Sequence, residues 1–183
     1  MINNLAKLKT LLKQQDNELS KITCCFTGHR PQFLPWRFNE NDNRCVRMKL
    51  EVKKQIEIAI TKGYKIFITG MALGFDMICA EIILELKKIY PNIKLIGAIP
   101  CKTQSKLWKL NDKQRYESIL HKLDSIRCIY DDYNGNECML ERNQFMVNNS
   151  SLVIALFNGK NGGTQKTLKY AKQLNRNIIL ITP

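Results

Sequence analysis

Two glycine-containing turns have the residue types needed to hold a phosphate or a ribose. The first, Gly70-Met71-Ala72-Leu73-Gly74-Phe75-Asp76, follows the apolar run Ile66–Thr69 and leads into a helix-like segment. The second, Gly162-Gly163-Thr164, opens the last helix-like segment of the chain. Glycines let the backbone approach a ligand closely, and a helix N-terminus offers unpaired N–H groups and a positive dipole end. Two such turns in one chain predict a nucleotide-type pocket.

The first turn also carries acidic candidates. Gly70, Met71 and Gly74 are expected to contact the ligand through the backbone. Asp76 has two compatible interpretations, as the N-cap of the following helix and as a partner for ribose hydroxyls. Glu81 lies further along the same helix and is the weaker candidate; these two acids are the catalytic candidates if the protein is an enzyme. The turn lacks the G-x-G-x-x-G spacing, which argues against an ordinary dinucleotide dehydrogenase.

The loop Thr27-Gly28-His29-Arg30-Pro31 follows another strand-like run and supplies a candidate anion contact. Gly28 permits a tight turn. His29 and Arg30 can then meet an anionic ligand, with Arg30 offering bidentate hydrogen bonds. The alternative is a surface loop with an incidental arginine. We favour binding because the loop is long and directly follows a strand.

The second turn and a nearby helix supply the remaining candidates. The second turn ends the loop Asn158-Gly159-Lys160-Asn161-Gly162-Gly163-Thr164. Its glycines free the backbone, Thr164 can cap the helix, and the N–H groups of the helix can hold a phosphate. A plain turn is the alternative, and we favour ligand binding. Arg142 and Asn143 lie in a helix-like segment. Two interpretations of this segment are equally supported. Arg142 reaches inward to a phosphate, or both residues belong to a solvated helix face.

Aromatic and sulfur residues have plainer interpretations. Trp108 and Tyr116 can stack on an adenine, but their helical spacing favours a place in the core. Cys25 and Cys79 lie within apolar patterns and are expected to be small buried side chains. The seven cysteines are irregularly spaced and only two histidines are present, so we expect neither a disulfide framework nor a metal site. This usage indicates a reducing, cytoplasmic setting.

Composition allows one soluble domain and raises the question of a polyanionic partner. The chain has 183 residues and a formal net charge of +13. Nucleic acid is therefore a possible partner, but we favour the alternative that the lysines are spread over solvated helix faces. No signal peptide and no apolar run of membrane-spanning length are present. A homo-oligomer is also possible.

Strand-like and helix-like segments alternate along the chain. The apolar runs predict strands at 22–27, 64–69, 93–99, 125–130, 152–157 and 177–182. The periodic segments predict helices at 44–61, 75–89, 103–121, 138–149 and 164–174, with Pro91 and Pro100 as breaks. Residues 1–20 are expected to form an amphipathic helical extension ahead of a domain over 21–183.

This alternation predicts an α/β fold. Short, continuously apolar strands indicate burial on both faces, which favours a Rossmann-like three-layer domain with a mostly parallel sheet and helices on both faces. Right-handed crossovers then place ligands beyond the carboxyl ends of the strands. Each of the three loops above follows a strand, so we expect them to converge on one edge of the sheet.

At these residues the chain resembles the YpsA-like branch of the SLOG superfamily. The resemblance is carried, over about 22–183, by Thr27–Pro31, Thr69–Asp76 with Ala80-Glu81, Gln104…Trp108…Arg115-Tyr116, Arg142–Val147 and Gly162-Gly163-Thr164…Tyr170-Ala171. It implies a Rossmannoid fold and a nucleotide-type pocket. Related SLOG proteins include the LOG phosphoribohydrolases, the single-stranded-DNA-binding DprA proteins and sensor domains for NAD-derived signals.

The chain departs from the LOG enzymes at a position that matters for catalysis. Those enzymes carry a catalytic Glu three residues after the glycine-threonine turn, where this chain has Thr167. A threonine can neither stabilise an oxocarbenium ion nor act as a carboxylate base. Arg142 does match the LOG arginine. Ser150-Ser151 also replaces an acid that is common in YpsA-like relatives.

Three functions therefore remain open. The favoured one is a binder of a nucleotide or ADP-ribose-like ligand, acting as sensor, carrier or sequestering protein, which requires no cofactor and takes a nucleotide or NAD-derived ligand. The second is a nucleotide phosphoribohydrolase or N-glycosidase, with Asp76 or Glu81 replacing the missing Glu. The third is a DprA-like single-stranded-DNA binder, for which the basic charge and the resemblance of Arg142 and Gly163-Thr164 provide support.

Overall fold

The computed structural model describes residues 15–183 and contains one six-stranded sheet. All strand pairs are parallel, in the order β4-β3-β2-β1-β5-β6. The strands are β1 (Thr23–Gly28), β2 (Ile66–Thr69), β3 (Lys94–Cys101), β4 (Ser125–Tyr130), β5 (Leu152–Leu156) and β6 (Asn177–Ile181). The helices are α2 (Asn43–Thr61), α3 (Phe75–Leu86), α4 (Leu110–Leu120), α5 (Gly135–Asn148) and α6 (Gly163–Gln173), with a 3₁₀ turn η1 at Pro31–Phe33. This confirms the predicted α/β class.

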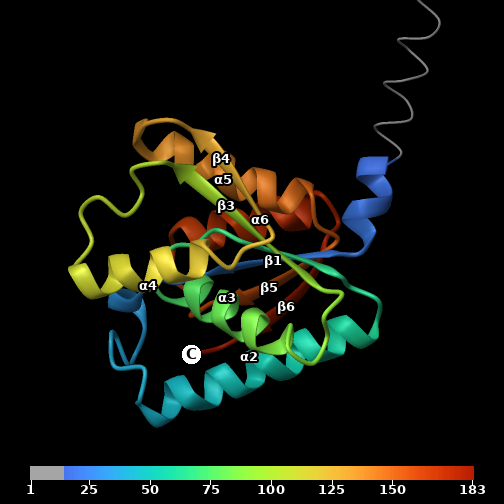
Figure 1. The fold of residues 1–183 in the computed structure, drawn as a ribbon, viewed down its shortest axis with the longest axis horizontal. Helices are drawn as coiled ribbons and strands as arrows, with labels where there is room; N and C mark the ends of the chain where they lie inside the picture. Colours follow the sequence, from blue (N-terminus) through green and yellow to red (C-terminus); the bar gives the residue numbers. More distant parts are fainter. Residues whose placement is uncertain (1–14) are drawn as a thin grey trace, which may run out of the picture.

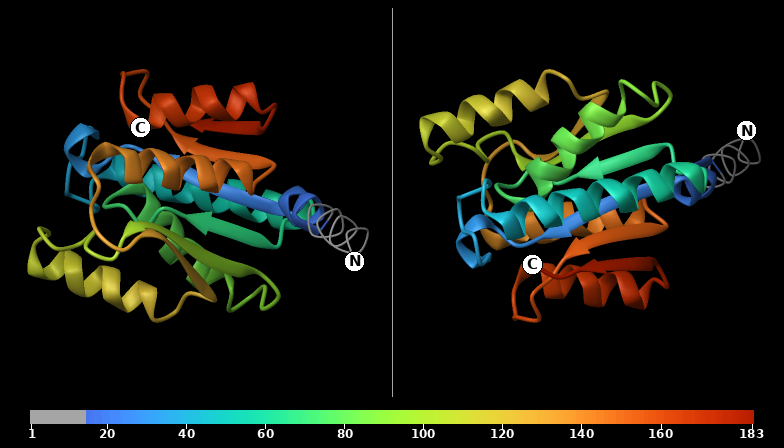
Figure 2. Two further views of the ribbon diagram at one scale, coloured as in Figure 1. Left: turned by 90° about the horizontal axis from the view of Figure 1, so that it is seen from above. Right: turned by 90° about the horizontal axis from the view of Figure 1, so that it is seen from below.

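The strand order divides the helices between the two faces of the sheet. The chain moves outward from β1 through β2 and β3 to β4, then returns across β1 to β5 and β6. Because the crossovers of parallel strands share one hand, the change of direction changes the face that the helices cover. Helices α2, α3 and α4 lie together on one face, and α5 and α6 lie on the other (Figures 1 and 2).

Two apolar cores hold these layers together. The larger lies under α2, α3 and α4, where side chains such as Val52, Ile56 and Ile83 pack on Phe26 and Phe67 of the sheet. Along β1 successive side chains alternate between the faces, so Cys25 belongs instead to the smaller core. That smaller core joins α5 and α6 to the sheet through Met146, Val147 and Ala171.

The cysteines are packing residues, as the sequence predicts. Cys25 is 1% exposed and Cys79 is fully buried, and all seven cysteines are free thiols. Burial raises the pKa of Cys25 to about 12, so its thiol is neutral at neutral pH. These side chains behave as small apolar groups.

Two predicted boundaries are wrong. Strand β3 does not stop before Pro100 but continues to Cys101. β2 ends opposite Gly97, so beyond that point β3 has a neighbour only in β4 and the missing N–H of the proline is tolerated. The helix predicted over 103–121 begins only at Leu110. Residues before it form turns, and Gln104 is held by a 2.7 Å hydrogen bond from its Nε2 to the carbonyl of Met71.

The remaining segments agree with the prediction to within a few residues, including α3, which ends at Leu86, and α5, which already starts at Gly135. Residues 15–21 are helical, and the rest of the predicted N-terminal extension lies outside the described residues. Within residues 15–183, none of the helices is both long and apolar enough to cross a membrane.

Candidate functional site

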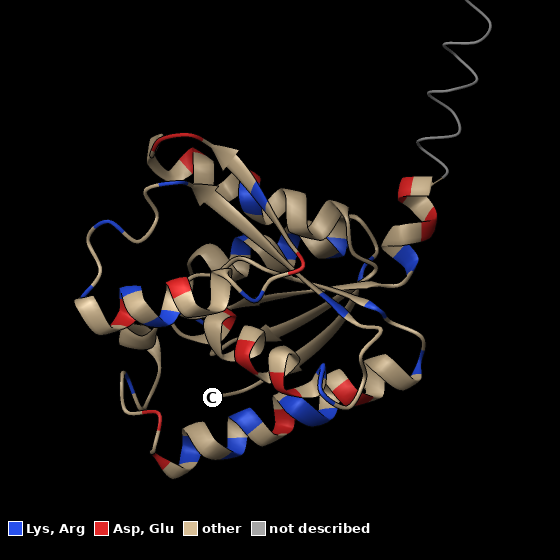
Figure 3. Cartoon of the chain, in the orientation of Figure 1, with Lys and Arg blue, Asp and Glu red and all other residues tan. Residues whose placement is uncertain are grey.

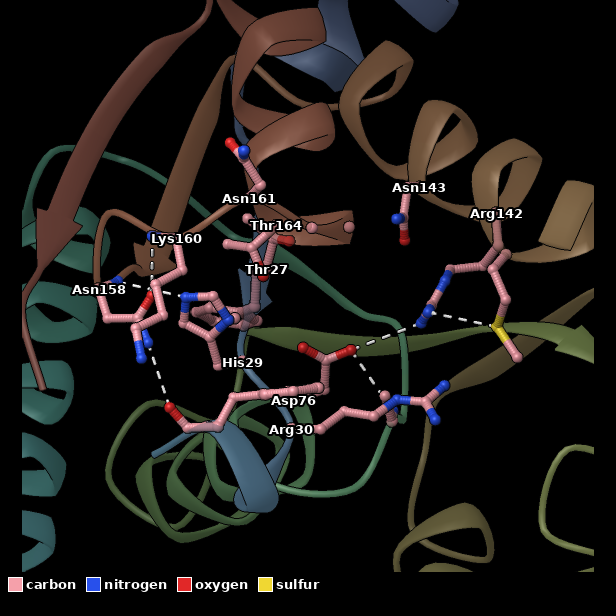
Figure 4. Close-up of a pocket in the computed structure, with 17 residues that line it drawn as sticks. Thr27, His29, Arg30, Asp76, Arg142, Asn143, Asn158, Lys160, Asn161 and Thr164 are labelled. Atoms are coloured by element: carbon pink, nitrogen blue, oxygen red, sulfur yellow. Dashed lines mark hydrogen bonds and ion pairs between the residues drawn. The ribbon is translucent and has the colours of Figure 1, made fainter. Parts of the chain in front are cut away.

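A pocket of about 330 Å³ opens at the carboxyl ends of β1 and β5. The connections leave these neighbouring strands in opposite directions, which makes this the switch point of the sheet and the place where open α/β folds leave a crevice. Its walls come from four segments, namely the loop after β1, the β2–α3 turn, one side of α5 and the loop from β5 into α6 (Figure 4). The three predicted loops therefore converge as expected.

Arg142 of α5 is the central cation of the pocket and is only 5% exposed. Its Nη1 donates a hydrogen bond to the carbonyl oxygen of Gly70 and lies 3.4 Å from Oδ2 of Asp76. Burial lowers the pKa of Arg142, and the Asp76 carboxylate opposes that effect. Its Nε is buried and has no hydrogen-bond partner within the described part of the chain. The guanidinium is therefore fixed in place with donor capacity left unused.

Asp76 faces Arg142 from the start of α3 and is 6% exposed. Burial raises the pKa of its carboxyl group, while the charge of Arg142 and the N–H of Ala72 act in the opposite direction. The N-cap prediction is wrong, because Gly74 holds that position with a φ of 92° and Asp76 lies in the first turn. Such a φ strongly favours glycine. The Asp76 carboxylate therefore lines the pocket and does not cap the helix (Figure 4).

His29 joins the loop after β1 to the loop after β5. Its Nε2 accepts a hydrogen bond from the N–H of Asn158 at 3.2 Å, and its ring stacks on Phe157 with centroids 5.7 Å apart. An Nε2 that accepts is unprotonated, so the ring is neutral with its proton on Nδ1. Burial lowers the pKa of His29, which favours the same state. His29 therefore fixes the separation of two pocket walls.

The amino end of α6 forms the wall opposite α3. Gly162 occupies the N-cap position, and no side chain caps the helix there. The prediction that Thr164 caps the helix is therefore wrong. Thr164 lies within the first turn and is 6% exposed. Unpaired N–H groups at this end face a pocket that also contains Lys160. A helix terminus and a nearby lysine create positive potential at this end.

Most of the predicted site residues line this pocket. They are Gly28, His29, Arg30, Asp76, Arg142, Asn143, Gly162, Gly163 and Thr164. Arg30 is exposed, and its side chain forms no hydrogen bond or ion pair with another residue among 15–183. Asn143 lies inside α5 and presents its amide to the pocket (Figure 4). Their binding roles stay predictions.

Three predicted glycine-turn residues lie behind the pocket wall instead. Gly70 contacts Arg142, and a Cβ at Gly74 would come within 2.9 Å of Pro31. Met71 is fully buried and has a φ of 52°, with its N–H bonded to Thr69 Oγ1 at 3.2 Å. These residues shape the wall through packing.

Glu81 lies away from the pocket. It accepts a 2.7 Å hydrogen bond from Nε of Arg115, which also pairs with Glu40, and Glu40 in turn pairs with Lys49 at 2.6 Å. The cluster ties α3 and α4 to the loop that precedes α2. Tyr116 is a core residue, as the sequence favours, whereas Trp108 is half-buried and packs against the core with an edge-on ring contact to Tyr116 at 5.2 Å.

Other pocket residues were not named as site residues from the sequence, although three of them lie in a loop that it favoured for binding. Asn158, Lys160 and Asn161 belong to the glycine-rich loop, and its polar side chains were a usable signal. Met139 and Phe33 carry no such signal, because only the chain path brings them to the pocket. Among residues 15–183 no group of three His, Cys, Asp or Glu side chains is arranged to hold a metal.

Several known proteins share this fold or sequence. The chain is 35% identical over 140 residues to a SPbeta prophage-derived protein, YoqJ, of Bacillus subtilis, covering 70% of this chain and 82% of that one. A UPF0398 protein of Brevibacillus brevis is 30% identical over 132 residues, covering 72% and 70%. The YpsA protein of B. subtilis is 25% identical over 141 residues, covering 76% and 78%.

Two solved structures share the fold. The DNA processing protein A of Helicobacter pylori, whose single-stranded-DNA binding mode is described, aligns with a TM-score of 0.61 and 16% identity over 91% of this chain and 67% of that one. The corresponding protein of Streptococcus pneumoniae aligns with a TM-score of 0.62 and 15% identity over 88% and 50%. The sequence model of the YpsA family, described as the YspA SLOG family, matches residues 24–183. The chain belongs to this YpsA family of SLOG proteins, as its motifs predict.

Proposed function

We propose that the pocket binds a small nucleotide-type ligand, with the phosphate at the amino end of α6 and a ribose near Asp76. The protein then acts as a sensor, carrier or sequestering protein. The observation that carries this proposal is the convergence of a helix N-terminus, Lys160, Arg30 and Arg142 on one pocket that also contains a buried carboxylate. Positive groups on several sides match a phosphate, and the carboxylate matches sugar hydroxyls.

The two arginines contribute differently. Arg142 is already bound to Gly70 and Asp76, so it offers a fixed positive charge. Arg30 is exposed at the rim and unpaired within residues 15–183, so its whole planar fork is available to an anion. Asp76 uses Oδ2 for Arg142 and the N–H of Ala72, and within the same residues Oδ1 has no hydrogen-bond partner. That second oxygen can accept from a ribose hydroxyl.

The size of the pocket supports a small ligand. Sites for small molecules usually have volumes of about 300–1,000 Å³, and this pocket has about 330 Å³. A sugar phosphate or the sugar-phosphate half of a nucleotide suits such a volume. The lining combines polar groups with Phe26, Phe33 and Met139, which supply apolar surface for the sugar.

Isothermal titration calorimetry with AMP and ADP-ribose tests the proposal. Arg30→Ala should weaken binding about tenfold or more, because a hydrogen bond to a charged group contributes about 1.5–3 kcal/mol. Lys160→Ala should weaken binding less, since a lysine acts as a mobile point charge. Lys169→Ala is the control, because Lys169 is exposed on α6 and outside the pocket. Unchanged affinity in Arg30→Ala, or no binding to the wild type, would refute the proposal.

A hydrolase is the second candidate, and one observation favours it. Asp76 is a buried pocket carboxylate whose pKa burial raises, which is a property of catalytic acids. Against it, Thr167 takes the place of the LOG glutamate and is itself occupied, donating from Oγ1 to the carbonyl of Gly163 at 2.9 Å. Incubation with AMP and NAD at high protein concentration tests this candidate. Released base that disappears in Asp76→Asn would support it, and no release would exclude it for these substrates.

Single-stranded DNA is a third candidate, motivated by the net charge of +13 and the fold shared with DNA processing protein A. Figure 3 argues against a dedicated surface, because lysines and arginines are spread over several elements and alternate with acids along α2. A complex should show a steep fall in affinity with salt, since phosphate contacts release counterions. The absence of a complex at low salt would exclude this function.

A further inference from the structure

A second cavity, of about 720 Å³, adjoins the first and shares Arg30, Ala72 and Met139 with it. Its outer walls come from the turns that lead into α4 and from the loop between β4 and α5. The larger cavity is here called the second chamber, and the pocket at the switch point is the first chamber. Because they share these lining residues, the two chambers are adjacent.

The side chains of the second chamber differ from those of the first. They include the aromatic rings of Trp108 and Tyr133, beside the amides of Gln104 and Asn136 and the charged groups of Lys106 and Asp132. Trp108 is held by its edge-on contact with Tyr116, so its position is set before any ligand arrives. Tyr133 is 59% exposed and Leu107 is 94% exposed. Flat apolar surfaces with nearby amides are suited to stacking a nucleobase and bonding its edge.

Arg30 stands at the boundary between the two chambers. Its charge opposes the effect of burial on the pKa of Asp76 and adds to the effect of burial on the pKa of Arg142, so its guanidinium lies near both groups (Figure 4). No carboxylate within residues 15–183 pairs with it. A free guanidinium between a sugar-phosphate chamber and an aromatic chamber is placed to bind the phosphates that join a sugar to a nucleoside.

We propose that the ligand is a nucleoside diphosphate-linked sugar that occupies both chambers, with its sugar beside Asp76, its diphosphate between the amino end of α6 and Arg30, and its base against Trp108 and Tyr133. This inference depends on the proposed function and refines its ligand class. It predicts that the ligand consists of two parts and that each chamber contributes separately to affinity. A ligand confined to the first chamber should be indifferent to changes in the second.

Calorimetry with ADP-ribose and with ribose 5-phosphate tests the inference. ADP-ribose should bind wild-type protein more tightly than ribose 5-phosphate. Tyr133→Ala should weaken ADP-ribose binding about tenfold, since stacking of a base on an aromatic ring typically changes affinity by about five- to 150-fold. The same variant should change the affinity for ribose 5-phosphate by less than about twofold, within the usual effect of a remote surface substitution. Tyr133→Phe, which keeps the ring, should bind ADP-ribose like the wild type.

Phe38→Ala is the matched control, because Phe38 is an exposed aromatic residue, 63% accessible, outside both chambers. Equal effects of Tyr133→Ala on both ligands, or no effect on ADP-ribose, would overturn the inference and leave the first chamber as the binding site. Binding of ribose 5-phosphate alone would also overturn it. If neither ligand nor AMP binds, the proposed function itself fails, which separates the two outcomes.

Discussion

Arg142 fills the space that a side chain at Gly70 would need. Its Nη1 bonds the Gly70 carbonyl, and a Cβ built on Gly70 would overlap that nitrogen and come within 2.6 Å of Oδ2 of Asp76. The glycine therefore exists to admit an arginine from α5, a segment far away in the sequence. The conformation of the first glycine turn and the position of α5 therefore depend on each other through this contact.

Gly70→Ala should destabilise the protein by about 3 kcal/mol or more, because it displaces a buried charge from its partners. Chemical denaturation measures the change. Gly163→Ala is the control, since a Cβ at that exposed position meets nothing within 4 Å; it should change stability by less than about 0.5 kcal/mol. Equal stabilities of the two variants would contradict the packing described for Arg142.

Arg142→Met should cost about 3 kcal/mol at pH 7, because it leaves Asp76 buried and uncompensated. Without the arginine the pKa of Asp76 in the folded protein rises further above its unfolded value. The stability that Asp76 contributes is then fully present below the unfolded-state pKa and is lost as pH rises through the folded-state pKa. The loss should therefore be smaller near about pH 4 than at pH 7. The double variant Arg142→Met with Asp76→Asn should recover part of the stability in a double-mutant cycle, and strict additivity would contradict the pairing.

His29 should make stability fall with acid. The pKa of His29 in the folded protein lies below the ordinary value of 6.5. The stability that His29 contributes is therefore fully present above the unfolded-state pKa and is lost as pH falls through the folded-state pKa. Denaturation curves at about pH 7.5 and about pH 5.5 measure this slope around the unperturbed pKa. His29→Gln should flatten the slope, whereas His121→Gln, a change at an exposed position after α4, should keep it. The same slope in both variants would refute the assignment.

Glu81→Gln should weaken folding without changing ligand affinity. The side chain of Glu81 is 43% exposed, so losing its ion pair with Arg115 should cost about 1 kcal/mol or less at moderate salt. Thermal denaturation measures that cost, and calorimetry with ADP-ribose measures the affinity. A large loss of affinity would place Glu81 in the binding site after all.

The parts of the fold that follow from local patterns were predictable. The continuous apolar runs located all six strands, and burial on both faces indicated parallel pairing. The failure at 103–121 has a physical cause. Leu107 fits a helical pattern but is 94% exposed, and Gln104 is fixed by the distant Met71 carbonyl. Tertiary contacts there outweigh local periodicity.

The sequence indicated where the pocket lies, but not which residues contact one another there. Glycines after strands and polar loops indicated where the pocket lies. The sequence alone could not show that Gly70 makes room for Arg142, or that Glu81 pairs with Arg115, because both contacts depend on strand order and helix placement. A residue can therefore be correctly noticed and wrongly explained, as with Asp76 and its expected cap.

The placement of β1 between β2 and β5 has an evolutionary consequence. The crevice arises from the order in which the chain visits the strands, so no loop residue creates it. Substitutions in the loops can therefore change which ligand binds without moving the binding crevice.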